Sequence, residues 1–198
     1  VFDGFNHEIL NYKVSTNEQS KLSLFKYLSS AEIYNLFIVD LNIGLFDRMN
    51  FSNGYGFLAY NAKDVVISNV ELTGSVLINA SYTKGSFGML IGSVENSATI
   101  QNILLDGTFS IYDFTSVDQM NRPIVIGGLI GSFDGKGQIM SNVIKLGNVV
   151  FFEDFNQVKS NIAKVIGEVS GNEIEVKNTL FSEGDGSQDS IPSFIVNE

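Results

Sequence analysis

The sequence predicts an all-β chain wound into a three-sheet β-solenoid, and three observations carry this prediction. Strand-forming residues are abundant, with 16 Phe and 7 Tyr among 198 residues, while 19 Gly and only 2 Pro favour turns over helices. A phrase made of an apolar residue, a spacer and Asn returns along the chain. Between its copies, each repeat offers three short β-prone runs separated by Gly, Asn and Ser. A fixed period of roughly 20–50 residues is typical of stacked repeat folds.

The Asn phrase sets the period of the repeat. Its last five Asn residues lie 34, 33, 40 and 36 positions apart, which predicts about five coils of roughly 33–40 residues. Around Asn35, the apolar residues Ile33 and Leu36 are three positions apart and would face opposite sides of a regular strand. A bend at Asn would turn both inward, because Asn tolerates left-handed backbone. We therefore expect a hydrogen-bonded ladder of stacked amides formed by Asn35, Asn69, Asn102, Asn142 and Asn178.

A Gly-rich phrase is the second repeated element. It is complete in the segment 127–131, which reads Gly-Gly-Leu-Ile-Gly, and degenerate elsewhere. Its glycines would allow positive φ or the close approach of neighbouring coils. The phrase lacks the G-x-G-x-x-G pattern of dinucleotide sites, so no phosphate cradle is predicted. The structural glycines expected from it are Gly88, Gly92, Gly127, Gly128, Gly131 and Gly167.

These two phrases resemble the GLUG-repeat family. The segment 128–131 fits the motif that names the family, and residues 2–14 are similar to the opening phrase of such domains. The resemblance covers residues 1–181 and implies a right-handed parallel β-helix within a large secreted or surface-anchored protein. Such repeats occur in bacterial surface adhesins and as the non-catalytic repeats of IgA-cleaving metallopeptidases. An extracellular or cell-surface location is therefore expected.

The chain is expected to divide near residue 181. Residues 1–181 form the β-helix domain, as part of a longer solenoid, and residues 182–198 form an acidic Gly/Ser linker and C-terminal extension. The net charge of −10 disfavours nucleic acids and anionic membrane surfaces as partners. No apolar stretch approaches the length of a membrane span, so this segment is not expected to insert into a membrane.

No catalytic constellation is recognisable, so we expect no enzymatic activity. His7 is the only His, and Asn at position 11 excludes the His-Glu-x-x-His motif of zinc peptidases. A carbohydrate-active β-helix would need carboxylates that converge on one site. Asp40, Glu71 and Asp106 come nearest to a column, but they follow their Asn residues at different intervals. No cofactor is predicted.

The irregular segments supply three further sets of candidate residues. Insertions in solenoids are often binding loops, and the insertion in the longest repeat offers Tyr112, Asp113, Phe114, Asp118 and Arg122. Candidate N-glycosylation sequons begin at Asn50 and Asn79. Calcium is the one metal left open, with oxygen ligands from Asp185 and Asp189.

The function expected from these features is that of a non-enzymatic structural or adhesive segment of a secreted or surface-anchored protein. Solenoids provide stalks and extended binding surfaces. Expected partners are proteins or glycans at a cell surface, or further copies of the chain, since open coils attract additional strands. An accessory repeat domain of a larger secreted enzyme and a carbohydrate-active β-helix enzyme remain as alternatives.

Overall fold

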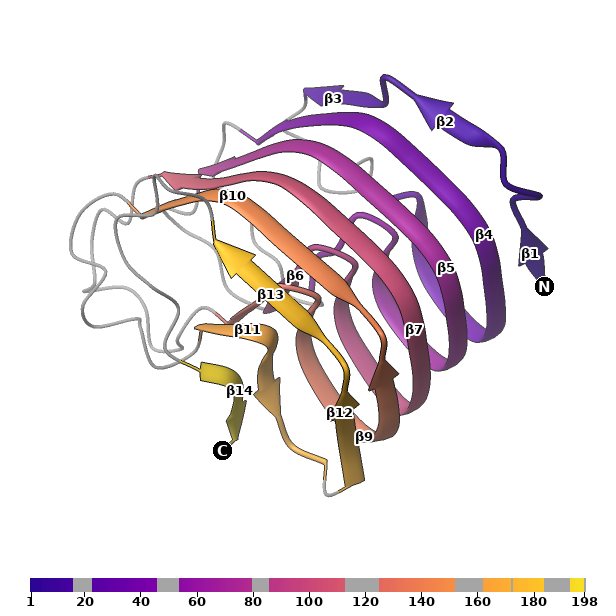
Figure 1. Ribbon diagram of the computed structural model, residues 1–198. Coiled ribbons are helices and arrows are strands. Elements are labelled where there is room, and N and C mark those ends of the chain that lie inside the picture. Colours follow the sequence, from indigo (N-terminus) through magenta and orange to yellow (C-terminus); the bar gives the residue numbers. More distant parts are fainter. Residues whose placement is uncertain are drawn as a thin grey trace.

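The computed structural model describes residues 1–15, 23–45, 54–79, 86–112, 125–151, 162–171, 173–183 and 193–197. Within these ranges the chain is nearly all β-strand without a helix, and its strands pair in parallel. The strands wind into a β-solenoid whose rungs, the successive layers of the stack, lie side by side along one axis (Figure 1). The predicted all-β solenoid is therefore confirmed.

Three long strands form the middle of the stack. They are β4 (Phe25–Leu45), β5 (Ala59–Asn79) and β7 (Ile91–Tyr112). They make about three turns in which the strand runs unbroken from one face to the next. The β-solenoid thus has about three turns and not the five or so coils predicted from the Asn spacings, because the rungs on either side are built from separate short strands.

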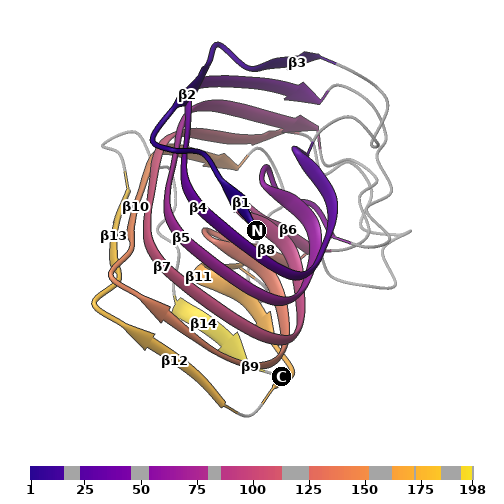
Figure 2. The ribbon, with the colours of Figure 1, turned by 90° about the vertical axis from the view of Figure 1, so that its right-hand side faces the viewer.

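Shorter strands complete these rungs and build the rungs on either side, and the two labelled termini lie at opposite ends of the stack (Figure 1). On the N-terminal side these strands are β1 (Phe2–Asp3), β2 (Glu8–Leu10) and β3 (Lys13–Ser15). The others are β6 (Ser86–Gly88), β8 (Val125–Gly127), β9 (Ile130–Met140), β10 (Val143–Phe151), β11 (Ile162–Val169), β12 (Glu173–Lys177), β13 (Leu180–Glu183) and β14 (Ser193–Asn197). Figure 2 shows the rungs nested one behind another when the stack is turned.

Each long strand changes direction at corners made by single residues. In β4 the corners are Ser30, Asn35 and Asp40, with φ of 47°, 53° and 58°. Residues with short polar side chains tolerate this left-handed conformation better than bulky residues. Four straight runs follow one another within β4, one more than the three predicted for each repeat.

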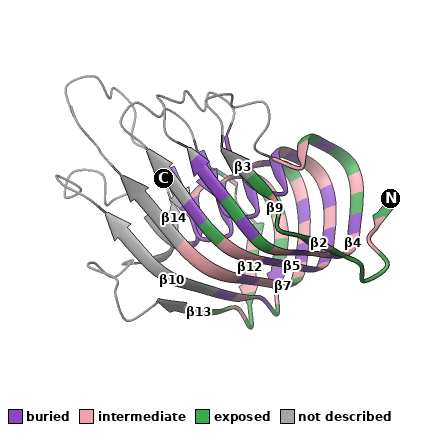
Figure 3. Cartoon of the chain, turned by 90° about the horizontal axis from the view of Figure 1, so that it is seen from above, coloured by how far each residue is buried: buried purple, intermediate pink, exposed green. Residues whose placement is uncertain are grey.

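The corner at Asn35 allows the core to close on both of its sides. Ile33 and Leu36 both point inward, with exposed fractions of 1% and 2%, as predicted from their spacing. Ile33 lies opposite Ile67, which lies opposite Ile100 in the next rung. Burying each such side chain stabilises the fold by about 1.5–3 kcal/mol. Buried and exposed residues therefore alternate along the rungs (Figure 3).

The Gly phrase forms a second continuous column in the core. Leu58, Leu90, Leu129 and Val165 are each completely buried. Along this column, the backbone N–H of each Leu donates to the carbonyl of the next residue, each at an N···O distance of 3.0 Å. Backbone hydrogen bonds at the third position of the phrase therefore help to join the rungs.

The glycines of this phrase allow two backbone segments to approach closely. A Cβ on Gly127 would collide with the carbonyl of Ile130, and a Cβ on Gly131 would collide with the backbone of Gly92 and Phe87. Neither glycine has a left-handed φ. Gly127 and Gly131 are therefore required for the close approach of neighbouring backbone and not for a positive φ.

An aromatic cluster fills the core beside these glycines. Tyr55 is completely buried and stacks on Phe87 at a ring-centroid distance of 5.1 Å. Phe57 and Tyr60 lie at 5.6 Å from Tyr55. Burial raises the pKa of the Tyr55 hydroxyl well above its ordinary value. The cluster is part of the packed interior.

Candidate functional site

The Asn residues of the three long strands β4, β5 and β7 stand in register at one corner of the solenoid. Asn35, Asn69 and Asn102 have φ between 53° and 56°. The Asn69 Nδ2 donates to the Asn35 Oδ1 at 2.6 Å, and the Asn35 Nδ2 donates to the Asp3 Oδ1 at 3.0 Å. The ladder therefore ends on a carboxylate that the sequence pattern did not reveal. The hydrogen bonds from Asn35 and from the backbone N–H of Phe5 lower the pKa of Asp3.

The structure corrects the position of Asn142. Met140 lies opposite Lys177 of the next rung, so Ser141 and not Asn142 occupies the corner, with φ of 56°. Asn142 lies one residue further along and is completely buried. Its Oδ1 accepts a hydrogen bond from the backbone N–H of Ile103 at 3.0 Å. It therefore serves the core rather than the ladder, and its prediction as a ladder residue is wrong.

The remaining predicted structural residues also lie at close backbone contacts or corners. Asn178 adopts φ of 49° and is exposed at the last rung of the corner column. A Cβ on Gly88, Gly92 or Gly128 would collide with neighbouring backbone, and Gly167 is the residue whose backbone lies against Gly127. These positions support the backbone of the solenoid.

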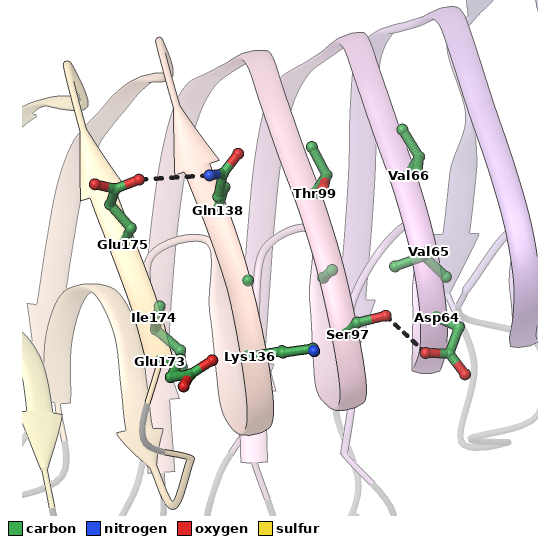
Figure 4. A pocket seen from close by; sticks show the side chains of 12 residues that line it. Asp64, Val65, Val66, Ser97, Thr99, Lys136, Gln138, Glu173, Ile174 and Glu175 are labelled. Atoms are coloured by element: carbon green, nitrogen blue, oxygen red, sulfur yellow. Dashed lines mark hydrogen bonds between the residues drawn. The ribbon is translucent and has the colours of Figure 1, made fainter.

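A hollow on the described surface crosses four rungs, β5, β7, β9 and β12, and we call it the axial groove (Figure 4). Its volume is about 790 Å³. The lining residues are Asp64, Val65, Val66, Ser97, Ala98, Thr99, Lys136, Gly137, Gln138, Glu173, Ile174 and Glu175.

One wall of the axial groove is a column of outward-facing side chains whose chemistry changes at every rung. Val66 lies opposite Thr99, Thr99 opposite Gln138, and Gln138 opposite Glu175. An apolar, a hydroxyl, an amide and a carboxylate group therefore follow one another. Along the opposite wall, Figure 4 shows acidic, hydroxyl and basic side chains in a similar succession.

Two of the three carboxylates of the axial groove, those of Asp64 and Glu175, bind neighbouring side chains. The Asp64 Oδ1 accepts hydrogen bonds from the Asn96 Nδ2 and the Ser97 Oγ, both at 2.6 Å. Glu175 forms an ion pair with Lys177. These contacts tie adjacent rungs or residues together. Within the part of the chain that the structure describes, no three His, Asp or Glu side chains gather as metal ligands would.

Asp64 and Asn96 belong to a second column of left-handed corners that the sequence analysis missed. Ser30, Asp64 and Asn96 have φ of 47°, 53° and 66°, and the same position in the next rung is Gly135 with φ of 144°. A signal for this column was present, because a short polar residue precedes each of the first three corner Asn residues by five or six positions. The axial groove lies beside this column.

Several predicted site residues fall outside the described residues or at their margins. Tyr112 is the last residue of β7, and Asn79 is the last residue of β5. Residue 181, the predicted domain boundary, falls within β13, and β14 pairs in parallel with β11. The candidates outside the described ranges are Asp113, Phe114, Asp118, Arg122, Asn50, Asp185 and Asp189.

The acidic residues considered for catalysis do not form a column. Phe37 lies opposite Glu71, and Thr73 lies opposite Asp106, so the two carboxylates are on different positions of their rungs. Asp40 is a corner residue with a left-handed φ.

Comparison with known proteins identifies no family for this chain. No protein-family profile matches the chain, and a search of curated proteins finds no match. The parallel solenoid is compatible with a β-helix family. Among the described residues, no helix is long and apolar enough to cross a membrane.

Proposed function

We propose that this chain is a non-enzymatic structural and adhesive segment of a secreted or surface-anchored protein, of the GLUG-repeat type. The observation that supports it is that the repeats preserve architecture and vary the surface. The inward column formed by Ile33, Ile67, Ile100 and Ile139 is uniform and almost completely buried. The adjacent outward column changes type at almost every rung, through Glu32, Val66, Thr99, Gln138 and Glu175.

A structural role fits this division between core and surface. A solenoid of this kind needs only the inward residues and the corners to be repeated, and its flat faces then offer an extended binding surface. The net charge of −10 helps to keep such a surface soluble. An enzyme would instead need one set of groups held in a defined mutual geometry.

The axial groove favours one alternative function, a carbohydrate-active enzyme. It carries the carboxylates of Asp64, Glu173 and Glu175 in an elongated hollow. Against this alternative, Asp64 is engaged by Asn96 and Ser97 of the next rung, as a corner residue would be.

The two functions are separated by testing binding and turnover on the same material. The chain is incubated with a panel of polysaccharides and with immobilised cell-surface glycans and proteins. We expect retention on surface material without the release of new reducing ends or unsaturated sugars.

The control variants address the axial groove directly. Asp64→Asn and Glu173→Gln each remove one of its three carboxylates, whereas Glu95→Gln removes an exposed carboxylate outside it. If the chain releases sugars and only the two groove variants abolish that release, the enzymatic alternative replaces the structural proposal.

A further inference from the structure

The axial groove is built where one corner of the solenoid gains an extra residue. In β4 and β5 a single residue, Ser30 or Asp64, separates the two straight runs that meet at this corner. In β7 and β9 two residues fill the same interval, at positions 96–97 and 135–136. An extra residue in a strand bends it and re-aims a side chain. The corner therefore closes with one residue, and the second residue is available to shape the surface.

The second residue of the widened corner forms one wall of the groove. Ser97 of β7 lies opposite Lys136 of β9, which lies opposite Glu173 of β12. Their side chains extend along the groove towards the neighbouring rung (Figure 4). The other wall is the outward column through Thr99 and Gln138. Each rung therefore presents a pair of polar groups, which are two hydroxyls in β7, an ammonium and an amide in β9, and two carboxylates in β12.

Three of these polar groups have no partner in the described part of the chain. The Lys136 ammonium, the Glu173 carboxylate and the Thr99 hydroxyl make no hydrogen bond or ion pair with a described residue. The Gln138 Nε2 donates to the Glu175 Oε2 at the long distance of 3.5 Å. Donors and acceptors are therefore available to a ligand along the middle of the groove.

The charges of the groove nearly balance. Lys177, outside the groove, forms an ion pair with Glu175. The remaining charged groups of the lining are two carboxylates, Asp64 and Glu173, and the ammonium of Lys136 between them. A polyanion would meet carboxylates towards both ends of the groove, and a polycation would meet the ammonium between them. The lining therefore favours a ligand without charge.

The spacing of the rungs limits the shape of that ligand. Neighbouring strands lie about 4.8 Å apart, so the polar pairs follow one another at this interval along the groove. Side chains on one side of an extended peptide repeat every two residues, at about 6.6–6.8 Å, and lose step with the rungs. The groove also lies on a sheet face, whereas extended peptides add to a strand edge. A β1→4-linked sugar chain is straight and advances by close to one rung per ring, with hydroxyl groups on both of its sides.

We propose that the axial groove binds a linear, uncharged, β1→4-linked glycan that lies along the solenoid axis with one sugar ring on each rung. Its hydroxyl groups accept hydrogen bonds from Lys136 and Gln138 and donate to Glu173. The inference rests on the adhesive function proposed above and assigns a site and a ligand class to it. None of the lining residues is aromatic, so each ring is held mainly by hydrogen bonds. Affinity is therefore expected to grow with the length of the sugar chain.

Titration calorimetry with soluble oligosaccharides tests the length of the site. The full chain is titrated with β1→4-linked oligomers of glucose and of N-acetylglucosamine that contain two to six rings. Affinity should rise about 2- to 10-fold with each ring up to four, since each ring gains about one net hydrogen bond. It should change little beyond four rings, because the groove crosses four rungs.

β1→4-linked oligomers of glucuronate are the charged control. They should bind more weakly than the uncharged oligomers of the same length, because the carboxylates of the lining repel them. An affinity that does not depend on length, or tighter binding of the glucuronate oligomers, would overturn the proposal.

Two variants and a matched control test the position of the site. Gln138→Ala and Thr99→Val each remove one polar group from the groove, and each should weaken binding of the four-ring oligomers about 2- to 10-fold. Gln101→Ala removes an amide from the same sheet face, two positions beyond Thr99 and outside the lining, and should leave the affinity unchanged. Circular dichroism checks that each variant is folded. Equal losses in all three variants, or no loss in the two groove variants, would overturn the proposal.

Retention on cell-surface material separates this inference from the proposed function. If the wild-type chain is retained but no oligosaccharide binds, the groove inference fails and the adhesive function stands. If the chain is retained on no surface material, the adhesive function fails. Length-dependent titration would then support a sugar site without an adhesive role.

Discussion

Two rungs make the same left-handed corner with different residues. In the rung of β5, Asn69 adopts the left-handed corner and joins the ladder with its own side chain. In the rung that joins β9 to β10, Ser141 adopts the corner, and the Asn that follows it enters the core. The comparison shows that backbone conformation and core register define the repeat, while the type of residue at the corner can change.

The Asn side chain has a different role in each of these two rungs. At the corner, Asn is valuable because its backbone tolerates positive φ and its amide reaches a neighbouring amide. In the core, Asn142 is valuable because its Oδ1 accepts from the N–H of Ile103, which would otherwise be buried without this partner. The same letter in the sequence therefore marks two unlike environments.

Replacing the buried Asn is expected to have the largest effect. Asn142→Ala leaves a cavity and removes the acceptor of the Ile103 N–H, so the free energy of unfolding should fall by about 2–4 kcal/mol. Urea unfolding followed by circular dichroism measures it. The matched control is Asn178→Gly, an exposed corner where the left-handed backbone is kept, with an expected change below about 0.5 kcal/mol. Equal losses in the two variants would contradict the separation of core and corner.

Replacing the corner Asn should cost less and should depend on the new residue. Asn69→Ala keeps a Cβ in left-handed backbone but removes the amide that makes this conformation tolerable and donates a ladder hydrogen bond, with an expected loss of about 1.5–2.5 kcal/mol. Asn69→Gly loses only the hydrogen bond and should cost about 1 kcal/mol. Thermal unfolding of both variants provides the comparison. Glycine being the worse of the two would argue against a left-handed corner.

Replacing Asp3, at the end of the ladder, is expected to have the smallest effect on stability, and that effect should depend on pH. The hydrogen bonds from Asn35 and Phe5 hold the pKa of Asp3 below its ordinary value, so the ionised form is favoured in the folded chain. This contribution is present above the ordinary pKa of 3.8 and is lost as the pH falls through the lowered pKa of the folded state.

Thermal melts across this acidic range measure that dependence. The difference between the wild-type chain and Asp3→Asn should be greatest above the ordinary pKa of Asp and should shrink below it. A difference that grows on acidification would show that Asp3 does not accept these hydrogen bonds as a carboxylate.

The sequence pattern was sufficient for the architecture but not for every register position. The spacing of Ile33 and Leu36 around Asn35 was enough to predict a bend, because alternation of side chains admits no other way to bury both. The pattern failed at Asn142, because the neighbouring Ser141 tolerates the corner conformation and residue type alone does not reveal which of the two bends. The corners at Ser30 and Asp64 were missed because the residue type of their column changes from rung to rung, so only its spacing to the next corner Asn repeats.

The axial groove could not be predicted from a repeated motif. Its outward column passes from Val66 through Thr99 to Gln138, and these residues share no chemistry. They become neighbours only because their rungs stack in register. The sequence pattern predicts that register with an uncertainty of one residue. Surface sites on a solenoid are therefore set by register, and an error of one position changes which side chains meet.

The account rests on Ser141, and not Asn142, occupying the corner between β9 and β10. The strand register at this corner is therefore the most direct test of it. The chain has no Cys, so a designed pair is the only intramolecular disulfide that can form. The structure places Met140 opposite Lys177, and the double variant Met140→Cys/Lys177→Cys is predicted to close under mild oxidation in the monomer. Closure of Ser141→Cys/Lys177→Cys instead would place Asn142 at the corner and contradict the account.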